Sequence, residues 1–129
     1  MTLNTRPLDI LRAGLEGVAY RFALIHQSIA PELPPDHQII GSGSGLLSSP
    51  AWMQMMADVL GRPLIASAER EATSRGIALL ALETLLPGVI AQNPAATDKT
   101  YFPNDEYHRR YQTALVEQVG LYNKLILDS

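Results

Sequence analysis

The chain has 129 residues, of which 47% are hydrophobic and 18% charged, with a net charge of −3 and no cysteine. These values suit one domain or part of one with a packed core, and they argue against disorder. They also exclude disulfides, thiolate chemistry and a basic surface for nucleic acid. The three histidines, His26, His37 and His108, show no metal-ligand spacing, so we expect no metal site.

Neither a secretory signal nor a membrane span is predicted. The N-terminal residues MTLNTRPLD lack a charged segment followed by an apolar one. The most apolar run, residues 77–90, is short and contains Glu83 and Pro87. We therefore expect a cytoplasmic protein that makes no membrane contact.

Residues 7–29 predict a long first helix, capped by Thr5 and with Pro7 in its first turn. Gly14 and Gly17 lie inside it, where each glycine costs about 1 kcal/mol relative to alanine. We therefore expect another backbone to approach them closely. Apolar residues at steps of three and four form one stripe along this helix: Leu8, Leu11, Leu15, Val18, Phe22, Ile25 and Ile29.

The middle of the chain predicts a strand, a glycine-rich loop, a helix and a second strand. Ser49 and Pro50 are typical of a helix start, and Gly61 of a helix end. The expected order is a Pro-rich connection at 30–37, a buried strand at 38–42, a loop with Gly41, Gly43 and Gly45, a helix at 50–60 and a strand at 62–66.

The last third of the chain predicts two more helices. They span residues 70–86 and 105–127, separated by a loop at 91–104, with a break at Pro87-Gly88. Tyr107, Tyr111 and Tyr122 are expected to dock the last helix. Two short strands among four helices would leave sheet edges exposed, which indicates part of a larger α/β sheet.

The loop sequence IGSGSG at residues 40–45 has two readings. A glycine-rich turn between a strand and a helix can bring backbone N–H groups to a ligand, or it can be a flexible turn only. The dinucleotide pattern G-x-G-x-x-G fails because Leu46 occupies the third glycine position, and no Gly-Lys-Ser/Thr follows. Neither common phosphate loop is therefore present.

The stretch GSGSGLLSSPAWMQMMADVLGRPL resembles the adenosine-binding segment of the FGGY carbohydrate kinases. That segment continues from a glycine loop as W-x-Q-x-x-A-D-v-l-g-r-p-v. Three further segments agree in order, and the resemblance covers nearly the whole chain. They are RAGLEGVAYRF at 12–22, EATSRGIALLAL at 71–82 and the tail with Tyr101, Pro103, Tyr107, Tyr111 and Tyr122. The loop leans toward the gluconate- and xylulose-kinase-like branch.

The resemblance implies an actin/hexokinase-like, ribonuclease H-like α/β ATPase fold. Residues 1–129 would be the C-terminal segment of its ATP-binding domain, mostly helical with two short strands. The family's sugar-binding lobe, aspartate base, metal site and D-x-G-T-like phosphate loop precede the matching segment and are absent from this chain. The implied function is nucleotide binding within a kinase that transfers the γ-phosphoryl of ATP to a hydroxyl of a sugar or sugar acid.

The resemblance also implies which residues lie near ATP. We expect Gly43, Ser44, Gly45, Leu46 and Ser49 beside the adenosine, with no catalytic residue and no Mg²⁺ ligand in this chain. The family has a Gly-Gly pair where this chain has Gly43-Ser44, or Ser44-Gly45 if the register shifts by one. Asp58 is expected to be a structural carboxylate, and Glu16 a packing or hydrogen-bonding residue.

A second hypothesis stays open: a stand-alone helical interaction module that does not bind nucleotide. Ser44 and the short chain favour it. In the kinase reading, the chain alone would be inactive. In that reading it would also form a homo-oligomer that covers its exposed sheet edge and apolar helix face, with the 8–29 stripe as the candidate interface.

Overall fold

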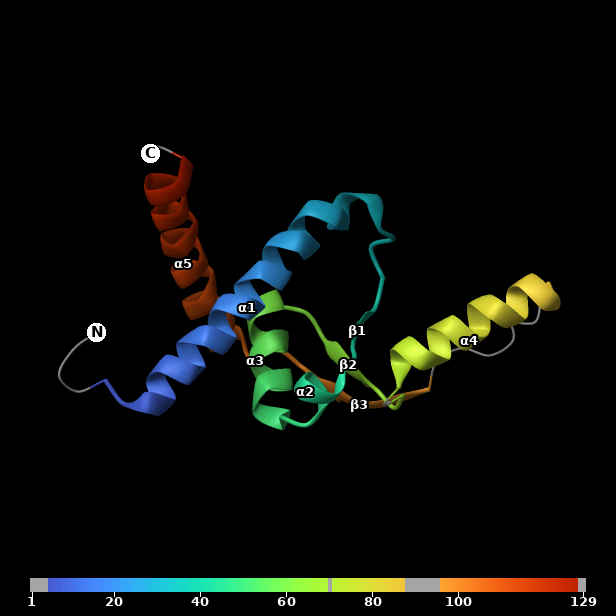
Figure 1. Cartoon of the computed structure of the whole chain (residues 1–129). Helices are drawn as coiled ribbons and strands as arrows, with labels where there is room; N and C mark the ends of the chain where they lie inside the picture. The colour runs from blue at the N-terminus through green and yellow to red at the C-terminus, as the bar shows by residue number, and fades with distance from the viewer. Residues whose placement is uncertain (1–4, 70, 88–95, 128–129) are drawn as a thin grey trace.

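The computed structural model describes residues 5–69, 71–87 and 96–127. It is mostly helical with one small sheet (Figure 1). The expected break at Gly88 and loop residues 91–95 lie outside the described residues. In chain order the elements are α1 (Pro7–Ile29), a 3₁₀ turn (Ala30–Glu32), β1 (Ile39–Gly41), α2 (Ser44–Leu47), α3 (Pro50–Leu60), β2 (Leu64–Ser67), α4 (Ala72–Leu85), β3 (Thr97–Tyr101), α5 (Asp105–Tyr122) and a π-helical turn (Asn123–Leu127).

The expected first helix is confirmed, but its expected cap is wrong. The N-cap residue is Arg6 rather than Thr5. The backbone N–H of Arg6 donates to the Asp9 carboxylate at 2.8 Å, which satisfies a group that the first turn would otherwise leave unpaired. Asp9 also carries the negative charge that a helix N-terminus favours.

The sheet has three strands in the order β1-β2-β3, one more than expected. β1 and β2 are parallel, with Ile39 opposite Leu64, while β3 runs antiparallel to β2 with Tyr101 opposite Leu64. The loop prediction for 97–101 was wrong because TDKTY has no alternating apolar pattern and its first three residues are exposed. Backbone pairing with β2, rather than side-chain burial, makes this segment a strand.

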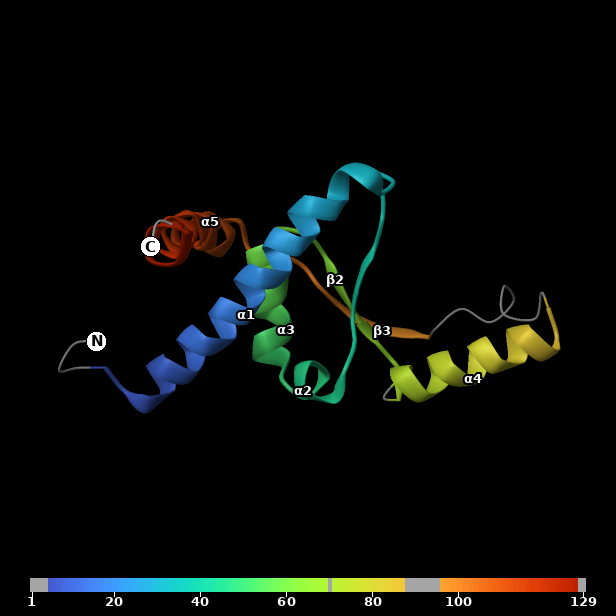
Figure 2. The same cartoon turned by 45° about the horizontal axis from the view of Figure 1, so that its top comes forward.

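The core is built around α3, which contacts α1, α2, α5 and β2 (Figure 2). α1 contributes small side chains, Ala19 and Ala23, so that the two helices can pack closely. Met53 and Val59 are almost completely buried on α3. The other buried apolar residues are Tyr20, Met56, Ala57, Leu64, Ala66, Tyr111 and Leu115.

Large apolar surfaces remain uncovered by the described residues. Every member of the 8–29 stripe except Leu15 is exposed, and Phe22 is 52% exposed. α4 projects away from the other elements and buries none of its residues, although it ends in several leucines (Figure 1). An added Cβ at Gly14 or Gly17 would meet nothing within 4 Å. The expected close approach at these two glycines is therefore not found.

Two polar residues of α3 hold the segment that leads into α5. Asp58 is 5% exposed, and its carboxylate accepts hydrogen bonds from the Asn104 backbone N–H at 2.8 Å and from Gln54 at 2.9 Å. Gln54 also donates to the Phe102 carbonyl at 2.7 Å. The structural interpretation of Asp58 is confirmed, and the same contacts explain Gln54 of the W-x-Q-x-x-A-D segment.

The end of α3 fits against α5 through Gly61. Gly61 has φ +65°, which favours glycine, and a Cβ there would lie 2.3 Å from His108 Cε1. The His108 ring hydrogen-bonds through Nδ1 to the Asp58 carbonyl at 2.8 Å. Because a carbonyl only accepts, this Nδ1 carries a proton, and His108 has a packing role here.

Replacing Asp58 with alanine should destabilise the chain by about 1–3 kcal/mol, because the Asn104 N–H loses its buried acceptor. Urea unfolding followed by circular dichroism measures this change. Asp98→Ala, at an exposed position of β3, is the matched control and should stay within about 0.5 kcal/mol of the parent chain. Equal losses in the two variants would contradict the assigned role of Asp58.

Candidate functional site

Two of the three loop glycines are needed, for different reasons. Gly41 ends β1 and is buried, and a Cβ there would lie 3.2 Å from both Leu46 Cδ2 and Met53 Cε. Gly43 has a backbone φ of +95°, which residues other than glycine rarely adopt. Gly45 has neither constraint, since an added Cβ would meet nothing within 4 Å. The loop is therefore a shaped turn rather than a merely flexible one.

A pocket of about 260 Å³ lies between this loop and the first turn of α4. Its wall contains three hydroxyls and one carboxylate, and none of its lining residues is basic. Glu71, the N-cap residue of α4, makes no side-chain cap, so it leaves first-turn N–H groups available to a ligand. The lining residues are Ser42, Gly43, Ser44, Glu71, Ala72 and Thr73.

The five residues expected near adenosine separate into different places. Gly43 and Ser44 line the loop pocket, and Gly45 lies next to them in α2. Leu46 instead lines an apolar pocket on the β1 side. Ser49 caps α3, accepting from the Trp52 backbone N–H at 3.3 Å, as its sequence position predicts. Glu71 and Thr73 join Gly43 only in the fold, because they lie almost thirty residues further along the chain.

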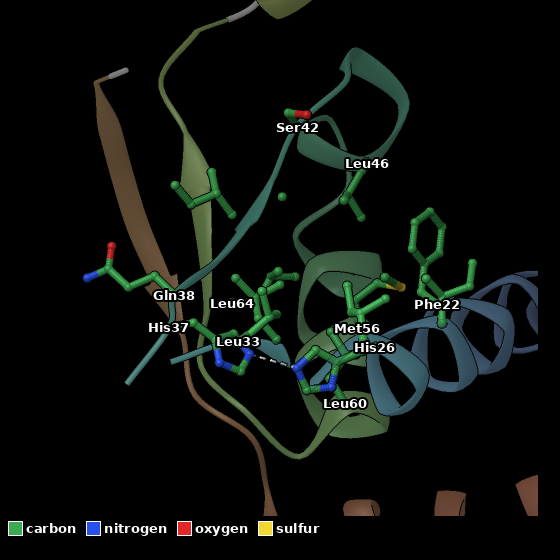
Figure 3. A pocket seen from close by; sticks show the side chains of 15 residues that line it. Phe22, His26, Leu33, His37, Gln38, Ser42, Leu46, Met56, Leu60 and Leu64 are labelled. Carbon is green, nitrogen blue, oxygen red and sulfur yellow. Dashed lines mark hydrogen bonds between the residues drawn. The ribbon is translucent and has the colours of Figure 1, made fainter. Parts of the chain in front are cut away.

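The apolar pocket has a volume of about 430 Å³ and lies between α1, β1 and α3 (Figure 3). It borders the outer edge of β1, on the side away from β2. No described strand pairs with β1 along this edge. Polar groups enter it mainly from His26 and His37, whose rings face one another at its rim. Its apolar lining includes Phe22, Ile25, Leu33, Leu46, Met56 and Leu60.

The histidine pair was missed by the sequence reading. The Nε2 atoms of His26 and His37 lie 2.9 Å apart, and His37 Nδ1 lies 2.6 Å from the Pro34 carbonyl oxygen. Arg62 donates to the carbonyls of Pro35 and His37, which holds the turn in place. His26 lies in α1 and His37 follows the Pro-rich turn after it, so that turn brings the rings together.

A second polar cluster connects α1 to α5. Glu16 accepts hydrogen bonds from Arg12 at 2.8 Å and from the Tyr111 hydroxyl at 3.3 Å, so its expected hydrogen-bonding role is confirmed. Burial raises the pKa of Tyr111, and burial followed by the Glu16 charge raises the pKa of Tyr20 to about 12. Both hydroxyls therefore stay protonated at neutral pH. Tyr111 docks α5, whereas Tyr107 and Tyr122 are more than 40% exposed.

A family model described as "FGGY family of carbohydrate kinases, C-terminal domain" matches residues 1–84, about two thirds of the chain. The chain belongs to this family. The cluster around Glu16 lies in the R-A-x-x-E-G segment, and the polar bonds of Gln54 and Asp58 lie in the W-x-Q-x-x-A-D segment. Both FGGY-like segments therefore have structural roles in this chain.

Individual relatives agree with the family assignment. A ribulokinase from Mycolicibacterium smegmatis is 28% identical over 127 residues, which cover 95% of this chain and 22% of that protein. The gluconate kinase structure from Lactobacillus acidophilus superposes with a TM-score of 0.77 at 22% identity, covering 97% of this chain and 26% of that one. A Plasmodium falciparum glycerol kinase solved with ADP gives a TM-score of 0.67 at 23% identity, covering 98% and 26%.

These structural neighbours have the actin/hexokinase-like fold, which confirms the expected fold class. The chain spans about a quarter of the length of the relatives that it matches.

The histidine pair makes stability depend on pH. Burial, then His37, then Arg62 lower the pKa of His26 in the folded chain. Since the unfolded pKa is about 6.5, the unfolded chain binds the proton first as the pH falls. The contribution of His26 is thus fully present above about pH 6.5 and is lost as the pH falls through the lowered folded value.

We expect His26→Gln to reduce this pH dependence, because glutamine can still donate to His37 but does not titrate. Urea unfolding of both chains from about pH 8 to pH 5 measures it. The two free-energy profiles should run parallel at the alkaline end and converge or cross at the acid end. Parallel profiles throughout would contradict the prediction.

Proposed function

We propose that this chain forms the adenosine-binding wall of an ATP site in a carbohydrate kinase. The pocket between Gly43 and the first turn of α4 is the observation that supports the proposal most directly. Family membership supports the nucleotide, and one structural neighbour was solved with ADP. Gly43 and Ser44 would contact the nucleoside, while Gly45, Leu46 and Ser49 would shape the loop behind them.

The chemistry of the pocket suits the uncharged part of a nucleotide. Hydroxyls of Ser42, Ser44 and Thr73 can exchange hydrogen bonds with a base or a ribose, and the Glu71 carboxylate can accept from ribose hydroxyls. A triphosphate would find no cation among the lining residues. We therefore place the phosphates outside this pocket, toward the parts of the kinase that precede this segment in the family.

The exposed apolar surfaces support a longer working protein. The stripe on α1, the unpaired edge of β1 and the uncovered α4 are surfaces that a soluble domain buries. We propose that residues 1–129 form the C-terminal segment of the ATP-binding domain, completed by a preceding sugar-binding and catalytic part. The whole enzyme would transfer the γ-phosphoryl of MgATP to a sugar or sugar-acid hydroxyl, and this chain alone would be inactive.

A cytoplasmic location belongs to the same proposal. None of the helices in the described part of the chain combines the length and apolarity needed to cross a bilayer. The proposal itself rests on the use of ATP by a kinase, and not on that finding.

A stand-alone interaction module is the second candidate. Its support is Ser44, which replaces a family glycine at the pocket and adds a side chain where a purine would approach. The exposed stripe and α4 would then serve partner binding instead of intramolecular packing. Nucleotide binding separates the two candidates.

We expect adenosine, ADP and ATP to bind this chain with affinities within about tenfold of one another. The reason is that no residue lining the pocket carries a positive charge that would attract the phosphates. Gly43→Val should abolish binding, since a β-branched side chain at φ +95° strains the loop by about 1–3 kcal/mol. Isothermal titration calorimetry with the three ligands measures both effects.

Gly120→Val is the matched control, because Gly120 lies on exposed α5 with open space around its Cβ position. It should bind like the parent chain. Binding that survives Gly43→Val in a folded protein would place the nucleotide elsewhere. An absence of binding, both here and in a chain extended toward its N-terminus, would favour the interaction module.

We also expect this chain in isolation to self-associate through the stripe on α1, because several large apolar side chains of the stripe would otherwise be exposed to solvent. Phe22→Glu should shift the mass toward the monomer in sedimentation equilibrium. Val116→Glu, at a similarly exposed apolar position on α5, should leave the mass unchanged. A monomer at high concentration in the parent chain would contradict the expectation.

A further inference from the structure

The Nε2 atoms of His26 and His37 lie 2.9 Å apart at the rim of the apolar pocket. We propose that the two Nε2 atoms bind one divalent transition-metal ion of the Zn²⁺, Ni²⁺ or Cu²⁺ class, with water in the remaining coordination positions. This site is separate from the loop pocket and does not depend on nucleotide binding.

The tautomer of His37 follows from its surroundings. Its Nδ1 lies 2.6 Å from the Pro34 carbonyl, which only accepts, so Nδ1 carries the proton and donates it. The Nε2 atom of neutral His37 is then unprotonated and has a free lone pair. A backbone carbonyl that receives the other ring N–H is the usual partner of a metal-binding histidine, because it fixes both tautomer and ring orientation.

His26 must then donate from Nε2 to His37 in the absence of metal. Among the described residues this is the one hydrogen bond assigned to its ring, and His26 is half-buried near the end of α1. Moving the proton from Nε2 to Nδ1 gives the other neutral tautomer and frees the second lone pair. Both rings would then offer Nε2 to the same ion, without a net change in charge.

The distance between the two nitrogens fits a shared ion. Nitrogen ligands lie about 2.0–2.1 Å from such metals, so two ligands at a right angle are about 2.9 Å apart and two tetrahedral ligands about 3.3 Å apart. The observed separation is 2.9 Å. The two Nε2 lone pairs now lie nearly along the line that joins the nitrogens. The rings must turn so that both lone pairs point at an ion beside that line.

The surroundings favour the neutral form of the His26 ring. Partial burial, the neighbouring ring and the Arg62 charge all lower the pKa of His26, so protons compete weakly for it. The Arg62 charge would disfavour the ion itself, but its guanidinium donates to the carbonyls of Pro35 and His37. No group of three or more His, Cys, Asp or Glu suited to a metal occurs within the described residues, so the protein supplies two ligands.

The test is titration of the untagged chain with ZnCl₂ by calorimetry, in a buffer that does not chelate metals. We expect saturable binding of one ion per chain at about pH 7.5, weakening as the pH falls because protons then compete for the imidazoles. His26→Gln and His37→Gln should each weaken it by at least about tenfold. His108→Gln is the matched control and should bind as the parent chain does, since its ring is held by Asp58.

Electron paramagnetic resonance with CuSO₄ gives a readout that a structural role would not affect. The parent chain and His108→Gln should show two equivalent nitrogen donors, and the two other variants fewer. Urea unfolding establishes that each variant is folded. No saturable binding to the folded parent chain would overturn the proposal, as would binding that both His26→Gln and His37→Gln retain.

Discussion

The buried face of α3 is the constraint on which the rest of the structure depends. Met53 and Val59 are buried on this helix of eleven residues, which contacts α1, α5 and β2 and so sets their positions relative to one another. The same helix begins at the Ser49 cap and ends at Gly61, whose left-handed backbone admits the His108 ring. A substitution that disrupts the Ser49 end would displace the glycine loop, which leads into it. One that disrupts the Gly61 end would displace α5, which packs there through His108.

Several conspicuous polar side chains connect elements of this fold. Asp58, Gln54 and Glu16 are the carboxylates and amide that sequence patterns make conspicuous, and each bonds to another part of the chain. The candidate binding surface instead consists of backbone, three hydroxyls and Glu71. A site of this kind positions a ligand by shape and hydrogen bonding, whereas charge stabilisation during phosphoryl transfer would need other parts of an enzyme.

Sequence patterns predicted the features whose cause is local. The long first helix, the Ser49 cap, the Gly61 terminator and the strands near residues 40 and 65 all follow from short-range preferences, and all are confirmed. The expected burial of the first strand is wrong, since only Gly41 of β1 is buried and Ile40 is exposed. β3 was missed because backbone hydrogen bonds to β2 make it a strand, and the sequence TDKTY carries no alternating apolar pattern that would predict them. The His26–His37 contact was missed for a related reason, since a turn closed by Arg62 creates it.

The candidate pocket shows the same division. Gly43 and Ser44 were predictable because a glycine turn between a strand and a helix is a local signal, and the family resemblance strengthened it. Glu71 and Thr73 were not predictable, since they reach the loop only through the crossover from β1 to parallel β2 and the turn into α4.

The exposed glycines extend this argument to the surfaces that remain open. Gly14, Gly17 and Gly76 each lie in a helix, where glycine weakens the helix, yet none is crowded by the described residues. They lie on α1 and α4, both of which leave large apolar side chains exposed, and Gly120 lies on α5 in the same way. Helix glycines that reduce stability without a packing reason are explained if another chain segment packs against these same faces. The cost of the glycines and the exposed apolar area therefore agree with the proposal that α1 and α4 are inner surfaces of a longer protein.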